Sequence, residues 1–98
     1  SSDKLALIKE KVKSFDDLED ILLDTQLGEE EFVSLLNTLG DMEIAVMIKR
    51  HPFQSPIQAV DLSEAEHIIR LYLEKYVHQL PSERREKIFH MAKHLIQD

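Results

Sequence analysis

The chain has 98 residues and a formal net charge of −7, and 43% of its residues are hydrophobic. This apolar fraction excludes a disordered chain and, at this length, is enough for one folded domain over residues 1–98. Because the sequence contains no cysteine, disulfides, thiol catalysis and thiolate metal sites are excluded. No apolar run has the length of a membrane span, so we expect no membrane association and a cytoplasmic location.

Three segments of the N-terminal half carry apolar residues at helical spacing. The first covers residues 3–13, and Ser14 has the side chain and position of an N-cap for a second helix over residues 15–25. A third helix follows Gly28 and ends at Gly40. Its apolar face consists of Phe32, Leu35, Leu36 and Leu39, at positions i, i+3, i+4 and i+7. This is the clearest helical pattern in the chain.

Residues 43–61 are compatible with two structures. A β-strand is predicted by the alternation of Met42, Ile44, Val46 and Ile48 with Glu43, Ala45, Met47 and Lys49, although the same stretch also fits a short buried helix. Two prolines place a loop over residues 51–56, and residues 57–61 would form the returning strand. Three helices followed by a β-hairpin is the element order of a winged-helix domain. The alternative is a plain helical bundle.

Two longer helices are predicted for the C-terminal part. Ser63 and Glu66 have the Ser-x-x-Glu spacing of a capping box, and the helix that they begin runs to about Gln79. Pro81 ends that helix and helps to start the last one. The fold class predicted is therefore mainly α: a compact five-helix domain with a C-terminal antiparallel helical hairpin and, in its winged-helix-like form, a short β-hairpin around residues 43–61.

Negative charge is concentrated in residues 16–31, which contain eight acids and no base. The candidate contact residues in this segment are Asp16, Asp17, Asp20, Glu29, Glu30 and Glu31. A recognition helix meets DNA with its N-terminal residues, which here are the three glutamates, and these would repel the phosphates. One interpretation is a solvated face that caps two helix starts. The other is a docking surface for a basic protein partner. A cation site lacks the loop spacing of an EF-hand.

Two features outside the acidic segment are further candidates. Lys49, Arg50 and Phe53 adjoin the predicted wing, and a winged-helix transcription regulator would contact DNA with them. Leu71 lies on the polar side of the predicted fourth helix. A single exposed leucine is normal, but together with Val77 it would also fit a homodimer or partner interface through the C-terminal helices.

Histidines and glutamates on the two C-terminal helices raise a metal-binding helical bundle as a third hypothesis. Glu86, His90 and His94 lie at i, i+4 and i+8, and Glu64 and His67 have the Glu-x-x-His spacing of bundle metal sites. A metal site in a bundle must face inward, however. The histidines of both sets fall opposite the apolar faces of their helices, so we expect solvated side chains and no metal.

Catalytic motifs are missing from the sequence. It has no nucleophile elbow and no P-loop, and two glycines leave little material for a phosphate-binding loop. We therefore expect neither an enzyme nor a bound cofactor. The leading hypothesis is a small interaction or regulatory module, such as an adaptor, inhibitor or antagonist, that docks a basic partner through residues 16–31.

Overall fold

All regular secondary structure in the described residues is helical. The computed structural model describes residues 2–24, 27–51 and 61–97, and within these ranges it contains six α-helices and no strand. The helices are α1 (Ser2–Lys11), α2 (Phe15–Asp24), α3 (Glu29–Thr38), α4 (Asp41–Arg50), α5 (Leu62–Val77) and α6 (Ser82–Gln97). The mainly α fold class is confirmed, whereas the predicted number of five helices is wrong because α4 was not counted among them.

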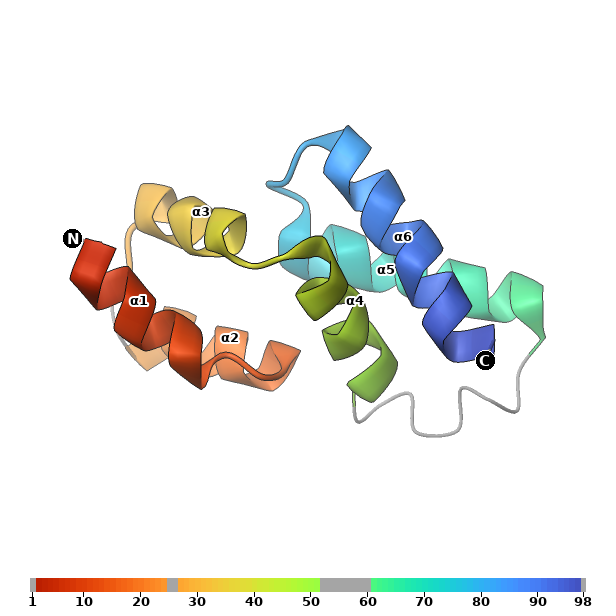
Figure 1. Cartoon of the computed structure of the whole chain (residues 1–98), viewed down its shortest axis with the longest axis horizontal. Helices are drawn as coiled ribbons and strands as arrows, with labels where there is room; N and C mark the ends of the chain where they lie inside the picture. The colour runs from red at the N-terminus through yellow and green to blue at the C-terminus, as the bar shows by residue number, and fades with distance from the viewer. Residues whose placement is uncertain (1, 25–26, 52–60, 98) are drawn as a thin grey trace.

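The six helices form an elongated body with extents of 42 × 26 × 19 Å. In Figure 1, α1, α2 and α3 gather at one end, α4 crosses the middle, and α5 and α6 extend to the other end. The most extensive contacts join α6 to α4 and α5, and α1 packs against α3. A single cluster of buried side chains includes residues from all six helices. Within the described ranges, none of the helices combines the length and the apolar character needed to cross a membrane.

The largest difference from the sequence prediction is α4. Its start resembles a capping box, because the Gly40 N–H donates to Glu43 Oε1 at 3.1 Å and the Ile44 N–H donates to the Gly40 carbonyl at 3.1 Å. Ile44 and Ile48 are fully buried, as expected for residues four apart on one helix face. The β-hairpin predicted around residues 43–61 is therefore wrong in its first strand. Residues 52–60, which include most of the second, lie outside the described residues.

Two other helix starts are fixed by side-chain caps. Ser14 caps α2 as predicted: its Oγ accepts from the Asp17 N–H at 3.2 Å, and Asp17 Oδ2 accepts from the Ser14 N–H at 3.1 Å. For α5 the prediction of Ser63 is wrong. Asp61 is the N-cap, and its Oδ1 accepts from the Glu64 N–H at 2.8 Å. The helix begins at Leu62, so Asp61 occupies the N-cap position and Ser63 lies within the first turn. The positive end of the helix dipole also favours an aspartate at this position.

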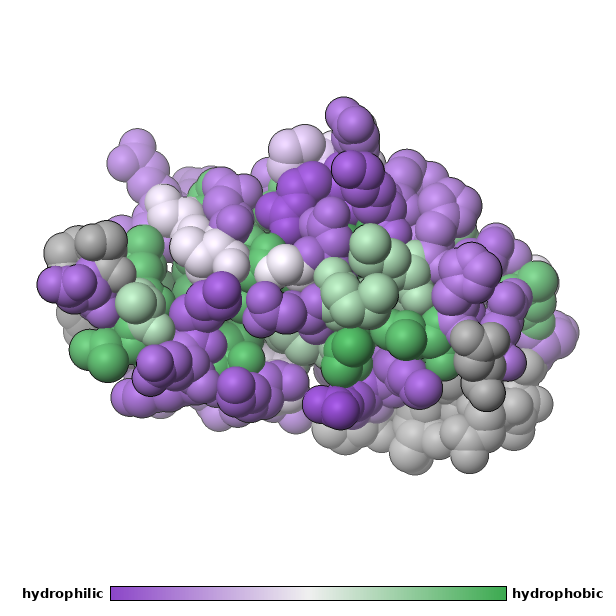
Figure 2. Space-filling model, viewed as in Figure 1, coloured by the Kyte–Doolittle hydropathy of each residue, from purple (hydrophilic) through white to green (hydrophobic). Residues whose placement is uncertain are grey.

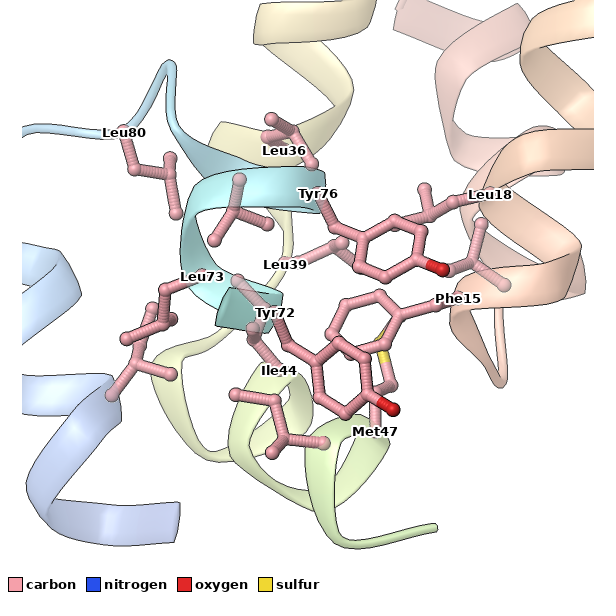
Figure 3. Close-up of a cluster of buried hydrophobic side chains, with 14 of the residues drawn as sticks. Phe15, Leu18, Leu36, Leu39, Ile44, Met47, Tyr72, Leu73, Tyr76 and Leu80 are labelled. Atoms are coloured by element: carbon pink, nitrogen blue, oxygen red, sulfur yellow. The ribbon is translucent and has the colours of Figure 1, made fainter. Parts of the chain in front are cut away.

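Aromatic side chains fill the junction of α2, α4 and α5. Phe15 is fully buried and stacks on Tyr76 with ring centroids 4.3 Å apart. Figure 3 shows these two rings face to face, with Tyr72 beside them and Met47 behind. His51, at the end of α4, is also buried, and its ring stacks on Tyr72 at 4.5 Å. This aromatic cluster joins the N-terminal helices to the C-terminal hairpin.

Helices α5 and α6 form a hairpin around the turn at residues 78–81, and α6 runs back along α5 (Figure 1). An ion pair between Arg70 and Glu86 joins the two helices. The Arg70 guanidinium also lies over the Phe89 ring, 3.7 Å from its centroid. Both contacts are at the surface, so their contribution to stability is small beside the apolar interface that they border.

Arg84 of α6 binds the junction between α3 and α4. Its Nε donates to Asp41 Oδ1 at 2.8 Å, and its Nη2 donates to the carbonyl of Leu39 at 2.9 Å. The Arg84 and Asp41 side chains are only 25% and 21% exposed. Leu39 is the C-cap of α3, so this bond satisfies one of the carbonyls that a helix leaves unpaired at its end.

We expect Arg84→Met to lower the free energy of unfolding by about 1–2 kcal/mol, because it removes charge-assisted hydrogen bonds from a partly buried site but keeps the aliphatic stem. Urea unfolding followed by circular dichroism measures the change. Lys87→Met, on an exposed residue of the same helix, serves as the control and should change stability by less than about 0.5 kcal/mol. Equal losses in the two variants would show that Arg84 does not stabilise the junction.

Candidate functional site

The acids of residues 16–31 have two different roles in the structure. The carboxylates of Asp17 and Glu31 accept hydrogen bonds from backbone N–H groups at the starts of α2 and α3. Asp17 Oδ2 accepts from the backbone N–H groups of Lys13 at 2.9 Å and Ser14 at 3.1 Å. Because these bonds fix the turn between α1 and α2, the Asp17 carboxylate is occupied within the chain. Asp17 therefore has a capping role in the structure, and its role as a contact residue stays a prediction.

Glu31 is the second acid with an internal role. Its Oε1 accepts from the Gly28 N–H at 3.3 Å, and its Oε2 lies 3.5 Å from Lys4 Nζ. The hydrogen bond from the Gly28 backbone and, after it, the charge of Lys4 lower the pKa of Glu31. This carboxylate therefore starts α3 and ties α1 to it. A substitution of Glu31 would change folding as well as surface charge.

Glu19 borders the aromatic cluster. Its Oε1 lies 4.0 Å from Lys75 Nζ. Burial first, and then a hydrogen bond to Glu19, raises the pKa of Tyr76 to about 12. The Tyr76 phenol therefore stays protonated at neutral pH. Glu19 acts mainly on neighbouring side chains of the same molecule.

The remaining acids face solvent. Asp16, Asp20 and Asp24 on α2 are exposed, and so are Glu29 and Glu30 in the first turn of α3. None of the five makes a hydrogen bond or ion pair with another residue in the described part of the chain. Negative charge near a helix N-terminus is favourable in itself, and that accounts for Asp16, Glu29 and Glu30 but not for the acids farther along α2.

An exposed leucine lies among the acids of α2. Leu23 is 78% exposed, the most exposed of the large hydrophobic residues of the described chain. Asp16, Asp20, Leu23 and Asp24 lie at i, i+4, i+7 and i+8, so they share the outward face of the helix. We call these four residues the acidic ridge. Asp16 and Asp20 are among the contact residues predicted from the sequence, and Leu23 is not.

An apolar cleft lies beside the ridge, between α2, α3 and the end of α5. It encloses about 190 Å³. Leu18, Leu22, Phe32 and Tyr76 form its apolar walls, and Glu19, Lys75, His78 and Gln79 also line it. Leu22 is 44% exposed here. The outward surface of α2 therefore presents both carboxylates and apolar side chains.

The histidines of the C-terminal hairpin are exposed, as predicted. His67, His90 and His94 lie at the surface, and Glu86 is bound by Arg70. The hydrogen bond from Arg70 lowers the pKa of Glu86. The described residues contain no group of three or more side chains suited to hold a metal ion.

The prolines that follow His51 predicted a loop, so the burial of its side chain was not expected from the sequence. Its Nε2 lies 3.3 Å from Tyr76 Oη. Burial lowers the pKa of His51, and the charge of Lys75 lowers it further, while Asp16 and Glu19 oppose the shift. Its surroundings are aromatic and closed, so we assign His51 to the core.

The remaining candidates lie at the ends of helices or on the hairpin. Lys49 and Arg50 are exposed in the last turn of α4, not on a wing strand, and Phe53 lies outside the described residues. Leu71 is 55% exposed on α5, as predicted, but Val77 is fully buried. Leu71 is therefore a single exposed leucine, without the neighbour proposed for an interface.

Residues brought together by the fold thus differ from the predicted set. The exposed contact candidates are Asp16, Asp20, Glu29 and Glu30, with Leu23 added and Asp17 and Glu31 removed.

No protein family matches the chain, and comparisons with curated proteins and with solved structures found no match either.

Proposed function

We propose that the chain is a protein–protein interaction module that binds a basic partner through the acidic ridge of α2 and through Glu29 and Glu30 of α3. The observation that carries this proposal is Leu23, which is 78% exposed between carboxylates that form no hydrogen bond or ion pair with the described residues. A leucine on an acidic helix face costs free energy in water and gains it in an apolar contact. An acidic face without such an anchor would serve solubility alone.

The chemistry of the partner follows from this face. Long-range attraction between the carboxylates and lysine or arginine side chains accelerates encounter and orients the two proteins. Leucine burial then holds the complex together. The partner is therefore a basic helix or groove that also presents an apolar surface. Residues at the edge of such an interface set the rate of association more than the affinity.

A defined peptide tests the proposal. The probe is a fluorescent helical peptide of about 20 residues with lysine and arginine on one face and leucine on the other. We expect binding by fluorescence anisotropy with a dissociation constant in the micromolar range. The variant Asp16→Asn/Asp20→Asn/Asp24→Asn should weaken binding by about tenfold or more, and Leu23→Ala by about fivefold, since these changes remove the charge and the anchor separately.

A matched variant separates the ridge from net charge. Glu10→Gln/Glu64→Gln/Glu83→Gln removes the same number of charges from exposed acids of α1, α5 and α6. It should leave the affinity within about twofold of the parent protein. Equal weakening by both triple variants would reduce the interaction to net charge and overturn the proposal. Equal binding of a peptide with glutamate in place of every basic residue would also overturn it.

A further inference from the structure

A second surface, with the opposite charge, lies between the end of α1 and α4. It is a groove of about 230 Å³. Val12, Met42, Val46 and Met47 form its apolar part, and Lys13 and Arg50 stand on its edge. This volume is below the roughly 300–1,000 Å³ that is usual for small-molecule sites. The groove is therefore suited to the side chains of a peptide segment.

The apolar part of the groove is a stripe along α4. Met42, Val46 and Arg50 lie at i, i+4 and i+8, away from the buried face of the helix. Met42 is 50% exposed. Figure 2 shows green surface over α4 in the middle of this face, bordered by purple. Methionine is flexible and polarisable, so it adapts to different apolar partners.

Positive charge at the edge of the groove is unpaired. The side chains of Lys13 and Arg50 are exposed, and neither forms an ion pair with any residue in the described ranges. The one acid that lines the groove, Glu43, is bound by the Gly40 N–H and lies 4.0 Å from Lys9 Nζ. Lysine and arginine near a helix C-terminus are favourable in themselves. Here, however, they also flank an exposed apolar stripe.

We infer that this groove binds an acidic segment of a partner protein, with a large apolar side chain of that segment seated on Met42 and Val46 and its carboxylates on Lys13 and Arg50. Charge complementarity selects this occupant, because Lys13 and Arg50, which form no ion pair with the described residues, line the groove together with the apolar stripe on which the anchor sits. The guanidinium of Arg50 suits a carboxylate in particular, since it can donate two parallel hydrogen bonds. This inference is independent of the acidic ridge and of its basic partner.

The net charge of −7 does not prevent this interaction. At physiological ionic strength the Debye length is about 8 Å, so exposed acids farther than this from the groove are largely screened. Pairs in direct contact are screened much less. The affinity therefore depends on the local cations, and removing one of them has a larger effect than removing a cation elsewhere on the surface.

Synthetic peptides test the groove directly. The probe is a labelled peptide of about 15 residues that carries leucine and phenylalanine anchors at helical spacing and aspartate or glutamate elsewhere. We expect a dissociation constant in the range of about 10–100 µM by fluorescence anisotropy at about 0.15 M salt. Lys13→Gln and Arg50→Gln should each weaken binding about threefold to tenfold, and Met42→Ser should do the same.

Controls are available on other helices. Lys87→Gln removes the same charge from α6, and Leu62→Ser removes an apolar side chain that is 47% exposed at the start of α5. Both should leave the affinity within about twofold of the parent. Thermal melting of each variant confirms that it is folded.

Three results would overturn the inference. The first is equal weakening by the groove and control variants. The second is equal binding of a peptide with lysine in place of every acid. The third is self-association of the protein that Met42→Ser abolishes, since the occupant would then be a second copy of this chain. If the basic peptide did not bind the acidic ridge, none of these three results would change. Each proposal can therefore be overturned without the other.

Discussion

Replacement of Phe15 by alanine is expected to lower the free energy of unfolding by about 3–5 kcal/mol, the usual cost of deleting a buried phenylalanine side chain. Phe15 is fully buried, stacks on Tyr76 at 4.3 Å and lies 5.8 Å from the His51 ring centroid. Small domains are stable by only about 5–15 kcal/mol. The loss is therefore a large fraction of the total stability of a domain of this size.

Urea unfolding of the variant and the parent protein measures this loss. Leu23→Ala is the control, since it also shortens an apolar side chain of α2 but at a position 78% exposed, and it should change stability by less than about 0.5 kcal/mol. A loss below about 1 kcal/mol for Phe15→Ala would mean that the aromatic cluster closes around the cavity or is loosely packed. Phe15→Leu, which keeps most of the apolar volume, should lose less than the alanine variant.

Acidification through the titration range of histidine should destabilise the protein through His51. Burial holds the pKa of His51 below its ordinary value of 6.5. The unfolded chain therefore binds a proton near that pH while the folded chain resists it. The stability associated with neutral His51 is fully present above about pH 6.5 and is lost progressively as the pH falls through the lowered pKa of the folded state.

Unfolding free energies at about pH 7.5 and about pH 5.5 test this expectation. The parent protein should lose more stability between the two values than His51→Phe, which keeps an aromatic ring but cannot bind a proton. His90→Gln, at an exposed histidine of α6, is the matched control that removes a histidine from the surface. A pH dependence that is the same in His51→Phe and the parent would show that acids or other histidines cause it.

Local signals in the sequence were sufficient for most of the helices. The apolar spacing from Phe32 to Leu39 predicted α3, and the capping residue Ser14 predicted the start of α2, because both depend on neighbours within one or two turns. The segment of α4 was ambiguous for a physical reason. Met42 and Val46 lie on its outer stripe, and their apolar character produced an apparent strand alternation. Packing against α6, a contact distant in sequence, favours the helix.

The candidate surfaces were less predictable than the helices. Sequence alone located the acidic segment, but Asp17 and Asp20 look equivalent there, and only the fold shows that one caps a helix and the other faces solvent. Leucine is a typical core residue, and only the packing of α2 against the rest of the chain shows that Leu23 is exposed. The groove beside α4 combines residues of that helix with Val12 and Lys13 from the turn after α1, which is distant in sequence, so no local pattern indicates it.

The aromatic cluster also determines what fluorescence reports about this protein. The chain has two tyrosines and no tryptophan, and both tyrosines, Tyr72 and Tyr76, lie in that cluster. Tyrosine emission therefore follows a single junction between α2, α4 and α5, whereas far-ultraviolet circular dichroism follows every helix. Among the described side chains of α1, Ile8 is buried in the core cluster and Leu5 packs against it, so fewer buried side chains hold this helix than hold α2 or α3. Coincident melting curves would show one cooperative unit. A circular dichroism signal that falls before the emission changes would show that some helices unfold while the aromatic cluster stays packed.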